Sequence, residues 1–116
     1  MNISAKCRIP IYGDHLYLRA SDDIVGARNR LDYIFGENSA KNYDGLVSSN
    51  LSFFGIFLKS ERLTHEIIGH EIFHVTCRIM QYNNILFEAD NHEAYAYLNG
   101  WIADWVYGKI PSRKIK

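Results

Sequence analysis

Two histidines and a glutamate form the most informative pattern in the chain. His70 and His74 are four residues apart, and Glu71 directly follows the first of them. Residues four apart lie one above the other on the same face of a helix. Two imidazoles placed in this way can both reach one tetrahedral Zn²⁺ ion, through ring nitrogens about 2.0–2.1 Å from the metal. Glu71 would then flank the metal without binding it, which is the position of a general base that acts on a metal-bound water.

The surroundings of this HExxH pattern favour a metal site over an ordinary buried helix. A buried helix can carry two histidines that hydrogen-bond to neighbouring backbone, with the glutamate on a solvated edge. Burying three titratable side chains without partners would cost about 1–3 kcal/mol each, and a shared metal ion removes that cost. The flanking positions are uncharged, as a half-buried helix requires; they are Ile67, Ile68, Gly69, Ile72, Phe73 and Val75.

Two nearby candidates for a third metal ligand fit the site poorly. A catalytic zinc site holds three protein ligands and a water. Cys77 lies on the same helical stripe as His70, but a separation of seven positions advances a helix by about 10.5 Å. Cys77 is therefore interpreted as a core or near-site residue. His65 points to a different face and is expected in the first turn of the helix.

The third ligand is expected from the segment that follows. Asp90-Asn91-His92-Glu93 opens a second apolar and aromatic stretch, far enough along the chain for a helix that returns across the first. Within that helix Glu93 shares a face with the small residues Ala96 and Gly100, which permit two helices to approach closely. Glu93 is therefore the predicted ligand, and His92 is the alternative.

These motifs resemble the gluzincin arrangement of zincin-like metallopeptidases. The HExxH pattern is followed, after eighteen residues, by Glu93-Ala94-Tyr95-Ala96-Tyr97-Leu98. The chain is particularly similar to minimal, single-domain HExxH proteins encoded by bacteriophages and prophages, which end in a comparable Glu-Ala-x-Ala-Tyr-Leu-x-Gly-Trp/Tyr-Ile stretch. The resemblance covers residues 64–106.

The resemblance assigns a role to each residue of the motif. It implies that His70, His74 and Glu93 bind zinc and that Glu71 is the catalytic base. The chain departs from the pattern of thermolysin-type enzymes at one position, because they place an aspartate four residues after the ligand glutamate and this chain has Tyr97 there. The group that orients a metal-bound histidine must then come from elsewhere.

Composition limits the class of protein. The 116 residues are 47% hydrophobic and 14% aromatic, which is enough for one domain with a compact core. Thirteen acidic and thirteen basic side chains give zero formal charge, so no general attraction to nucleic acid or to an anionic membrane is expected. The expected partners are a peptide or protein substrate, with a phage virion or host protein as a further possibility.

The cysteines and the two ends of the chain bear on localisation. Cys7 and Cys77 make no disulfide framework and are interpreted as reduced thiols. Residues 1–8 have no apolar signal region, and the chain has no run of 18 uncharged apolar residues. A cytoplasmic setting is expected, in a bacterial host or associated with a phage. Residues 109–116 are locally basic and are expected to be a frayed tail.

Apolar periodicity and turn residues predict the other elements. The metal helix is expected to start at a Thr64 or Ser60 cap, to end near residues 81–82 before Asn83-Asn84, and to bury a stripe of Ile68, Ile72, Val75 and Ile79. The final helix is expected at 91–107. Strands are predicted at 9–12, 16–19, 45–47 and 51–58, a helix from a Ser21 cap to a stop at Gly36, a polar loop at 37–44, and turns at 13–14 and 48–50.

Two further features have open interpretations. The strand before the metal helix, 53–58, is either an edge that pairs with an extended peptide substrate or a core strand with a bulge at Gly55. The aromatic residues of the final helix are interpreted mainly as core. Tyr97 is the exception, because its hydroxyl could hydrogen-bond a tetrahedral oxyanion; Tyr95 and His15 are weaker candidates for that role.

The sequence therefore predicts an α+β, zincin-like single domain over residues 1–116. A small antiparallel or mixed sheet is expected to pack on the metal helix, and a C-terminal helix is expected to supply the third ligand. The predicted function is hydrolysis of peptide or amide bonds with one Zn²⁺, with Glu71 and Tyr97 as catalytic residues. The alternatives are a metal-binding phage structural or accessory protein with little or no activity, and a metal-stabilised binding module.

Overall fold

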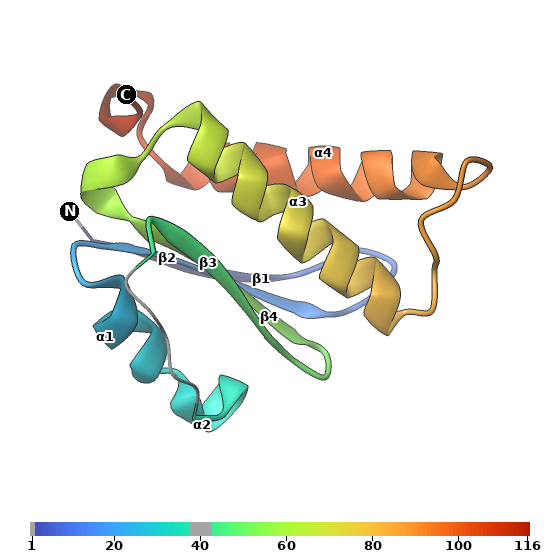
Figure 1. The fold of residues 1–116 in the computed structure, drawn as a ribbon, viewed down its shortest axis with the longest axis horizontal. Coiled ribbons are helices and arrows are strands. Elements are labelled where there is room, and N and C mark those ends of the chain that lie inside the picture. Colours follow the sequence, from blue (N-terminus) through green and yellow to red (C-terminus); the bar gives the residue numbers. More distant parts are fainter. Residues whose placement is uncertain (1, 38–42) are drawn as a thin grey trace.

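A four-stranded mixed sheet forms the centre of the structure, a computed structural model that describes residues 2–37 and 43–116 (Figure 1). The strands are β1 (Ile3–Arg8), β2 (His15–Ser21), β3 (Gly45–Asn50) and β4 (Phe53–Lys59), and they lie in the order β1-β2-β4-β3. β2 and β4 pair in parallel, whereas β1 and β3 are antiparallel to their neighbours. The predicted α+β class with a mixed sheet is confirmed.

Helices lie on both faces of this sheet (Figure 1). The long helices α3 (His65–Tyr82) and α4 (His92–Lys109) pack on one face, and the short helices α1 (Ile24–Asn29) and α2 (Asp32–Phe35) lie against the other. The alternation of side chains in a strand produces two cores. Leu16 and Leu18 of β2 join the large core under α3 and α4, while Tyr17 packs against the small core under α1 and α2.

Helix α3 has the boundaries and the buried stripe that the sequence predicts. Thr64 caps its start, where the side-chain oxygen accepts a hydrogen bond from the backbone N–H of Ile67 at 3.1 Å. The four predicted stripe residues are each at most 1% exposed, which fixes the face of α3 that lies on the sheet. Asn83 ends the helix, and Asn84 follows with a positive φ of 62°.

The first strand lies earlier than predicted. β1 spans Ile3–Arg8, and the predicted strand at 9–12 is instead the turn into β2. Pro10 and the positive φ values at Ile11 (70°) and Gly13 (75°) explain the turn. The sequence does carry a signal for β1, because Ile3, Ala5 and Cys7 alternate with polar residues at the period of a half-buried strand. The prediction followed the more apolar run at 9–12 instead.

The region between β2 and β4 also differs in detail from the prediction. The single helix expected to run to Gly36 is two short ones, and Asp23 rather than Ser21 caps α1, by accepting from the N–H of Gly26 at 2.9 Å. The hairpin turn lies at Leu51, with φ 52°, and not at 48–50, which belong to β3. The predicted loop at 37–44 falls largely on residues 38–42, outside the described residues.

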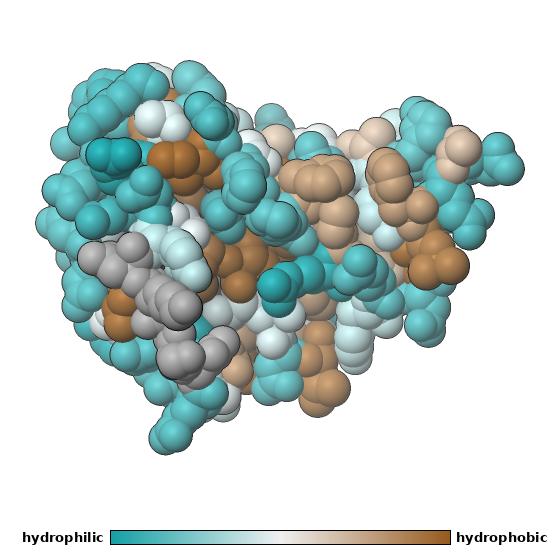
Figure 2. Space-filling view, in the orientation of Figure 1, coloured by the Kyte–Doolittle hydropathy of each residue, from teal (hydrophilic) through white to brown (hydrophobic). Residues whose placement is uncertain are grey.

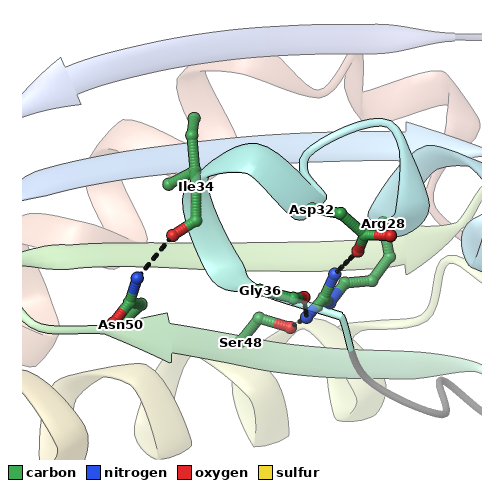
Figure 3. A network of polar contacts seen from close by, with 6 residues as sticks. All are labelled: Arg28, Asp32, Ile34, Gly36, Ser48 and Asn50. Carbon is green, nitrogen blue, oxygen red and sulfur yellow. Dashed lines mark hydrogen bonds and ion pairs between the residues drawn. The ribbon is translucent and has the colours of Figure 1, made fainter.

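A buried guanidinium joins α1 and α2 to β3 (Figure 3). Arg28 is 1% exposed. Its Nε donates to Ser48 Oγ at 2.9 Å, its Nη1 to Asp32 Oδ1 at 2.5 Å, and its Nη2 to the carbonyl of Gly36 at 2.9 Å. Because these bonds satisfy a buried charge, they fix β3 against the two short helices.

The basic C-terminal segment is docked, contrary to the expectation of a frayed tail. Ile110 is buried, and Ile115 packs against the large core. The backbone N–H of Lys116 donates to the carbonyl of Leu63 at 2.8 Å, and its Nζ donates to the carbonyl of Glu61 at 2.7 Å. The apolar residues within the basic segment explain the docking.

The surface is unevenly apolar. Figure 2 shows mainly hydrophilic residues around α1 and the start of α3, and hydrophobic ones near the connection between α3 and α4. That connection exposes Leu86 and Phe87. Within 2–37 and 43–116, no helix combines the length and the apolar character that crossing a membrane requires.

Candidate active site

The two histidines of the HExxH pattern point their ring nitrogens at each other. His70 and His74 lie on adjacent turns of α3, and their Nε2 atoms are 3.0 Å apart. The rings are nearly perpendicular, at 77°. Both residues are exposed. The helical spacing thus brings two imidazoles together at an accessible point, as the sequence predicts.

Glu71 lies beside this pair but is turned into the protein. The residue is 7% exposed, and its Oε1 is 3.9 Å from His70 Nε2. Burial raises the pKa of the Glu71 carboxyl, and the charges of His70, His74 and Arg78 lower it in part. Burial is the larger influence, so Glu71 holds a proton more readily than a free glutamate.

The edge strand β3 forms the wall beside Glu71. A Cβ atom at Gly45 would lie 2.9 Å from Glu71 Cγ, so the glycine lets strand and helix approach closely. Tyr43 and Asp44 precede it, and together these residues line a cavity with Glu66, Ile67, His70 and Glu71. His70 and Glu71 of the HExxH pattern therefore face an open cavity on the β3 side of α3.

The strand order decides between the two interpretations of strand β4. It pairs with β2 on one side and β3 on the other, so it is a core strand and not an edge. Gly55 is in regular register with both neighbours, without a bulge. The glycine makes room for aromatic rings, because a Cβ there would lie within 3 Å of atoms of Phe35 and Phe57. β3 is the edge beside the site.

The predicted third ligand is not grouped with the histidine pair. Glu93 is exposed in the first turn of α4. Thr76 of α3 meets Asn99 of α4, at 3.2 Å between Oγ1 and Oδ1, and the two helices run in opposite directions (Figure 1). From that contact, helix rise places Glu93 roughly 12 Å along the helices from His74. In the described part of the chain, no three His, Cys, Asp or Glu side chains form a metal-binding group.

The other predicted site residues also lie outside the cavity. Tyr97 lines a different cavity, between α4 and the turn after β1. His92 is exposed at the start of α4. Tyr95 is buried and donates to the carbonyl of Ile85. His15 stacks on Phe53 in the sheet. None of these side chains lines the cavity beside Glu71.

The remaining two candidates have structural surroundings. Cys77 is half-buried at the margin of the large core, and burial raises the pKa of its thiol. His65 begins α3, and its Nδ1 lies 3.1 Å from the hydroxyl of Tyr107. Both placements agree with the roles that the sequence predicts for them.

Sequence reasoning missed the residues that β3 and its approach contribute to the cavity. Tyr43, Asp44 and Gly45 carry no motif, and they lie far from His70 in the sequence. The available signal was the glycine at the start of a predicted strand, which can mark a close backbone approach.

Comparison with known proteins adds no assignment: no protein-family model, no curated protein and no solved structure matches the chain.

Proposed function

We propose that the chain is a zinc-dependent hydrolase of peptide or amide bonds. One observation carries the proposal: the Nε2 atoms of His70 and His74 converge to 3.0 Å, and a buried carboxylate lies 3.9 Å from one of them. Two nitrogens that share a tetrahedral zinc ion at about 2.05 Å are roughly 3.3 Å apart. The separation and the donor chemistry both fit zinc, so His70 and His74 would hold the ion.

Glu71 supports the hydrolytic part of the proposal. When bound, zinc acts as a Lewis acid that activates water and polarises a carbonyl. Glu71 would take the proton from the attacking water at Oε1 and pass it to the leaving amine. The burial of Glu71 beside Gly45 of β3 holds its carboxyl group at the wall of the cavity, where the attacking water would lie.

Strand β3 supports the choice of an extended substrate. It lies at the edge of the sheet and beside Glu71. The outer edge of such a strand offers backbone N–H and C=O groups to a further strand. A peptide held there would run past the cavity that His70 and Glu71 line, which places its backbone near the proposed catalytic base.

Glu71→Gln tests the hydrolase directly. The variant should retain zinc and the fold, and it should cleave a proteome-derived peptide library at least about a hundredfold more slowly than zinc-loaded wild type, since a general base contributes about 10²–10⁴-fold. Glu88→Gln removes an exposed carboxylate beyond α3 and should leave cleavage unchanged. Equal cleavage by wild type and Glu71→Gln, or none by either, would reject the hydrolase.

A metal-binding structural or accessory protein is the second candidate. The observation that favours it is the position of Glu93, because the described arrangement supplies two histidine ligands where a catalytic zinc site uses three protein ligands. Zinc binding by His70 and His74 with no cleavage by any form of the protein would select this function. A phage-encoded scaffold is the setting that the sequence resemblance implies.

A further inference from the structure

The sheet face opposite α3 and α4 is only partly covered. Helices α1 and α2 cover its β3 and β4 side, where Phe35 lies over Gly55 and Arg28 reaches Ser48. On the β1 and β2 side, the strand register places Lys6 beside Tyr17, and Arg8 beside His15 and Phe53, on this same face. We call the exposed part the open sheet face, and define it by Lys6, Arg8, His15, Tyr17 and Phe53, which line one cavity of about 370 Å³.

The open sheet face is basic and aromatic, with no carboxylate in its strands. Lys6 and Arg8 are exposed cations on β1, and they lie directly opposite Tyr17 and His15 on β2. The positions of β1, β2 and β4 that share this face contain no aspartate or glutamate; they are 4, 6, 8, 15, 17, 19, 21, 53, 55, 57 and 59. The zero net charge of the chain therefore conceals a locally positive surface.

The aromatic rings are arranged so that part of their π surface is accessible. His15 and Phe53 stack at 4.5 Å between centroids and 10° between planes. Phe53 and Tyr17 also pack against the small core, whereas His15 is not part of either core cluster and lines the cavity beside them. All three side chains are only half-buried. A wall of half-exposed rings beside two cations offers stacking and charge at the same place.

We propose that the open sheet face binds single-stranded nucleic acid. A base would stack on His15, beside the exposed parts of Tyr17 and Phe53, and phosphates would pair with Lys6 and Arg8; stacking combined with charge pairing is how single strands are held without sequence readout. An acidic peptide would use the two cations, but its carboxylates supply no aromatic base to stack on the rings. The proposal is independent of the histidine pair, which lies on the other side of the sheet.

A salt titration with a charge variant tests the electrostatic part. A fluorescent twelve-nucleotide single strand should bind wild type, and log affinity should fall with log salt at a slope near −1.4, from about −0.7 for each of two neutralised phosphates. Lys6→Glu/Arg8→Glu should lower affinity at least tenfold. Arg113→Glu/Lys114→Glu makes the same change in net charge at exposed residues near the C-terminus, and should leave affinity within about twofold.

A second pair of variants tests stacking. His15→Ala should lower affinity by about fivefold or more without changing the salt slope, whereas His15→Phe should retain it, because a base stacks on either aromatic ring. Circular dichroism and thermal unfolding confirm the fold of each variant. Two further probes are a duplex of the same sequence and poly-glutamate, and both should bind more weakly than the single strand. The proposal is overturned if the single strand does not bind, or if either probe binds as tightly. It is also overturned if His15→Ala binds the single strand as tightly as wild type.

Discussion

The polar side chains on the two flanks of helix α3 differ in their hydrogen-bond partners. On the flank that faces α4, the Thr76 hydroxyl lies 2.8 Å from the carbonyl of Ile72 and 3.2 Å from Asn99 Oδ1, and His65 meets the hydroxyl of Tyr107. On the flank that faces β3, the nearest polar partners of His70 and His74 are each other and Glu71.

This difference distinguishes polar side chains that stabilise the contact between two helices from those that are candidates for function. Polar groups on the α4 flank are hydrogen-bonded across a helix pair, so they contribute to packing and specificity of the contact. The β3 flank instead has an exposed histidine pair beside a buried carboxyl group, and burying that carboxyl group costs stability unless a ligand compensates. Groups held at such a cost beside a cavity are candidates for function.

The outcomes that would support or contradict this comparison differ most in zinc affinity. If α4 belongs only to the structural flank, Glu93→Gln should leave zinc affinity within about twofold, and His92→Ala should do the same; isothermal titration with zinc measures both. A loss of the 10–100-fold typical of a disturbed metal site in Glu93→Gln would instead make Glu93 the third ligand. It would also show that α4 lies closer to the pair when zinc is bound. The same loss in His92→Ala alone would move the ligand there.

The α4 flank is expected to contribute to stability and not to zinc binding. Thr76→Val removes the hydroxyl and preserves the shape, so the free energy of unfolding should fall by about 1 kcal/mol, the usual value for one net hydrogen bond. Urea denaturation measures the change. Zinc stoichiometry should be unaffected, and a variant that lost zinc would contradict the separation of the two flanks.

The smallest effect concerns the pH dependence of stability. Burial raises the pKa of Glu71 in the folded protein above its unfolded value, so the folded state binds the proton more tightly. The contribution of Glu71 is fully present below the unfolded pKa of about 4.3, and it is lost as pH rises through the raised folded pKa. The stability of zinc-free Glu71→Gln relative to wild type should therefore increase over that window. A difference that does not change with pH would contradict it.

The local features of α3 could be predicted from the sequence because they depend on neighbouring residues. The Thr64 cap, the isoleucine stripe and the Asn83 end each follow from helix geometry. The facing of His70 and His74 follows from the same period of 3.6 residues.

The features that the sequence did not predict depend on packing between distant segments. Helix propensity does not determine which residues of α3 lie beside Glu93. That position depends on how α4 is shifted along α3, and the contact of Thr76 with Asn99 fixes this shift. The pairing of β4 with β2 and β3 likewise depends on strand order, which the apolar pattern at 53–58 leaves open. β1 is an exception, because its alternating residues are a local strand signal that the prediction did not use.

The central claim, that the β3 flank of α3 is a metal site, is tested most directly by the zinc content of the purified protein. Wild type should hold about one equivalent by mass spectrometry under native conditions, and chelation should lower its melting temperature, because an ion that binds only the folded state stabilises it. His74→Ala should hold none, and Cys77→Ser should hold as much as wild type. Full zinc content in His74→Ala, or zinc-free wild type after incubation with the metal, would contradict the account.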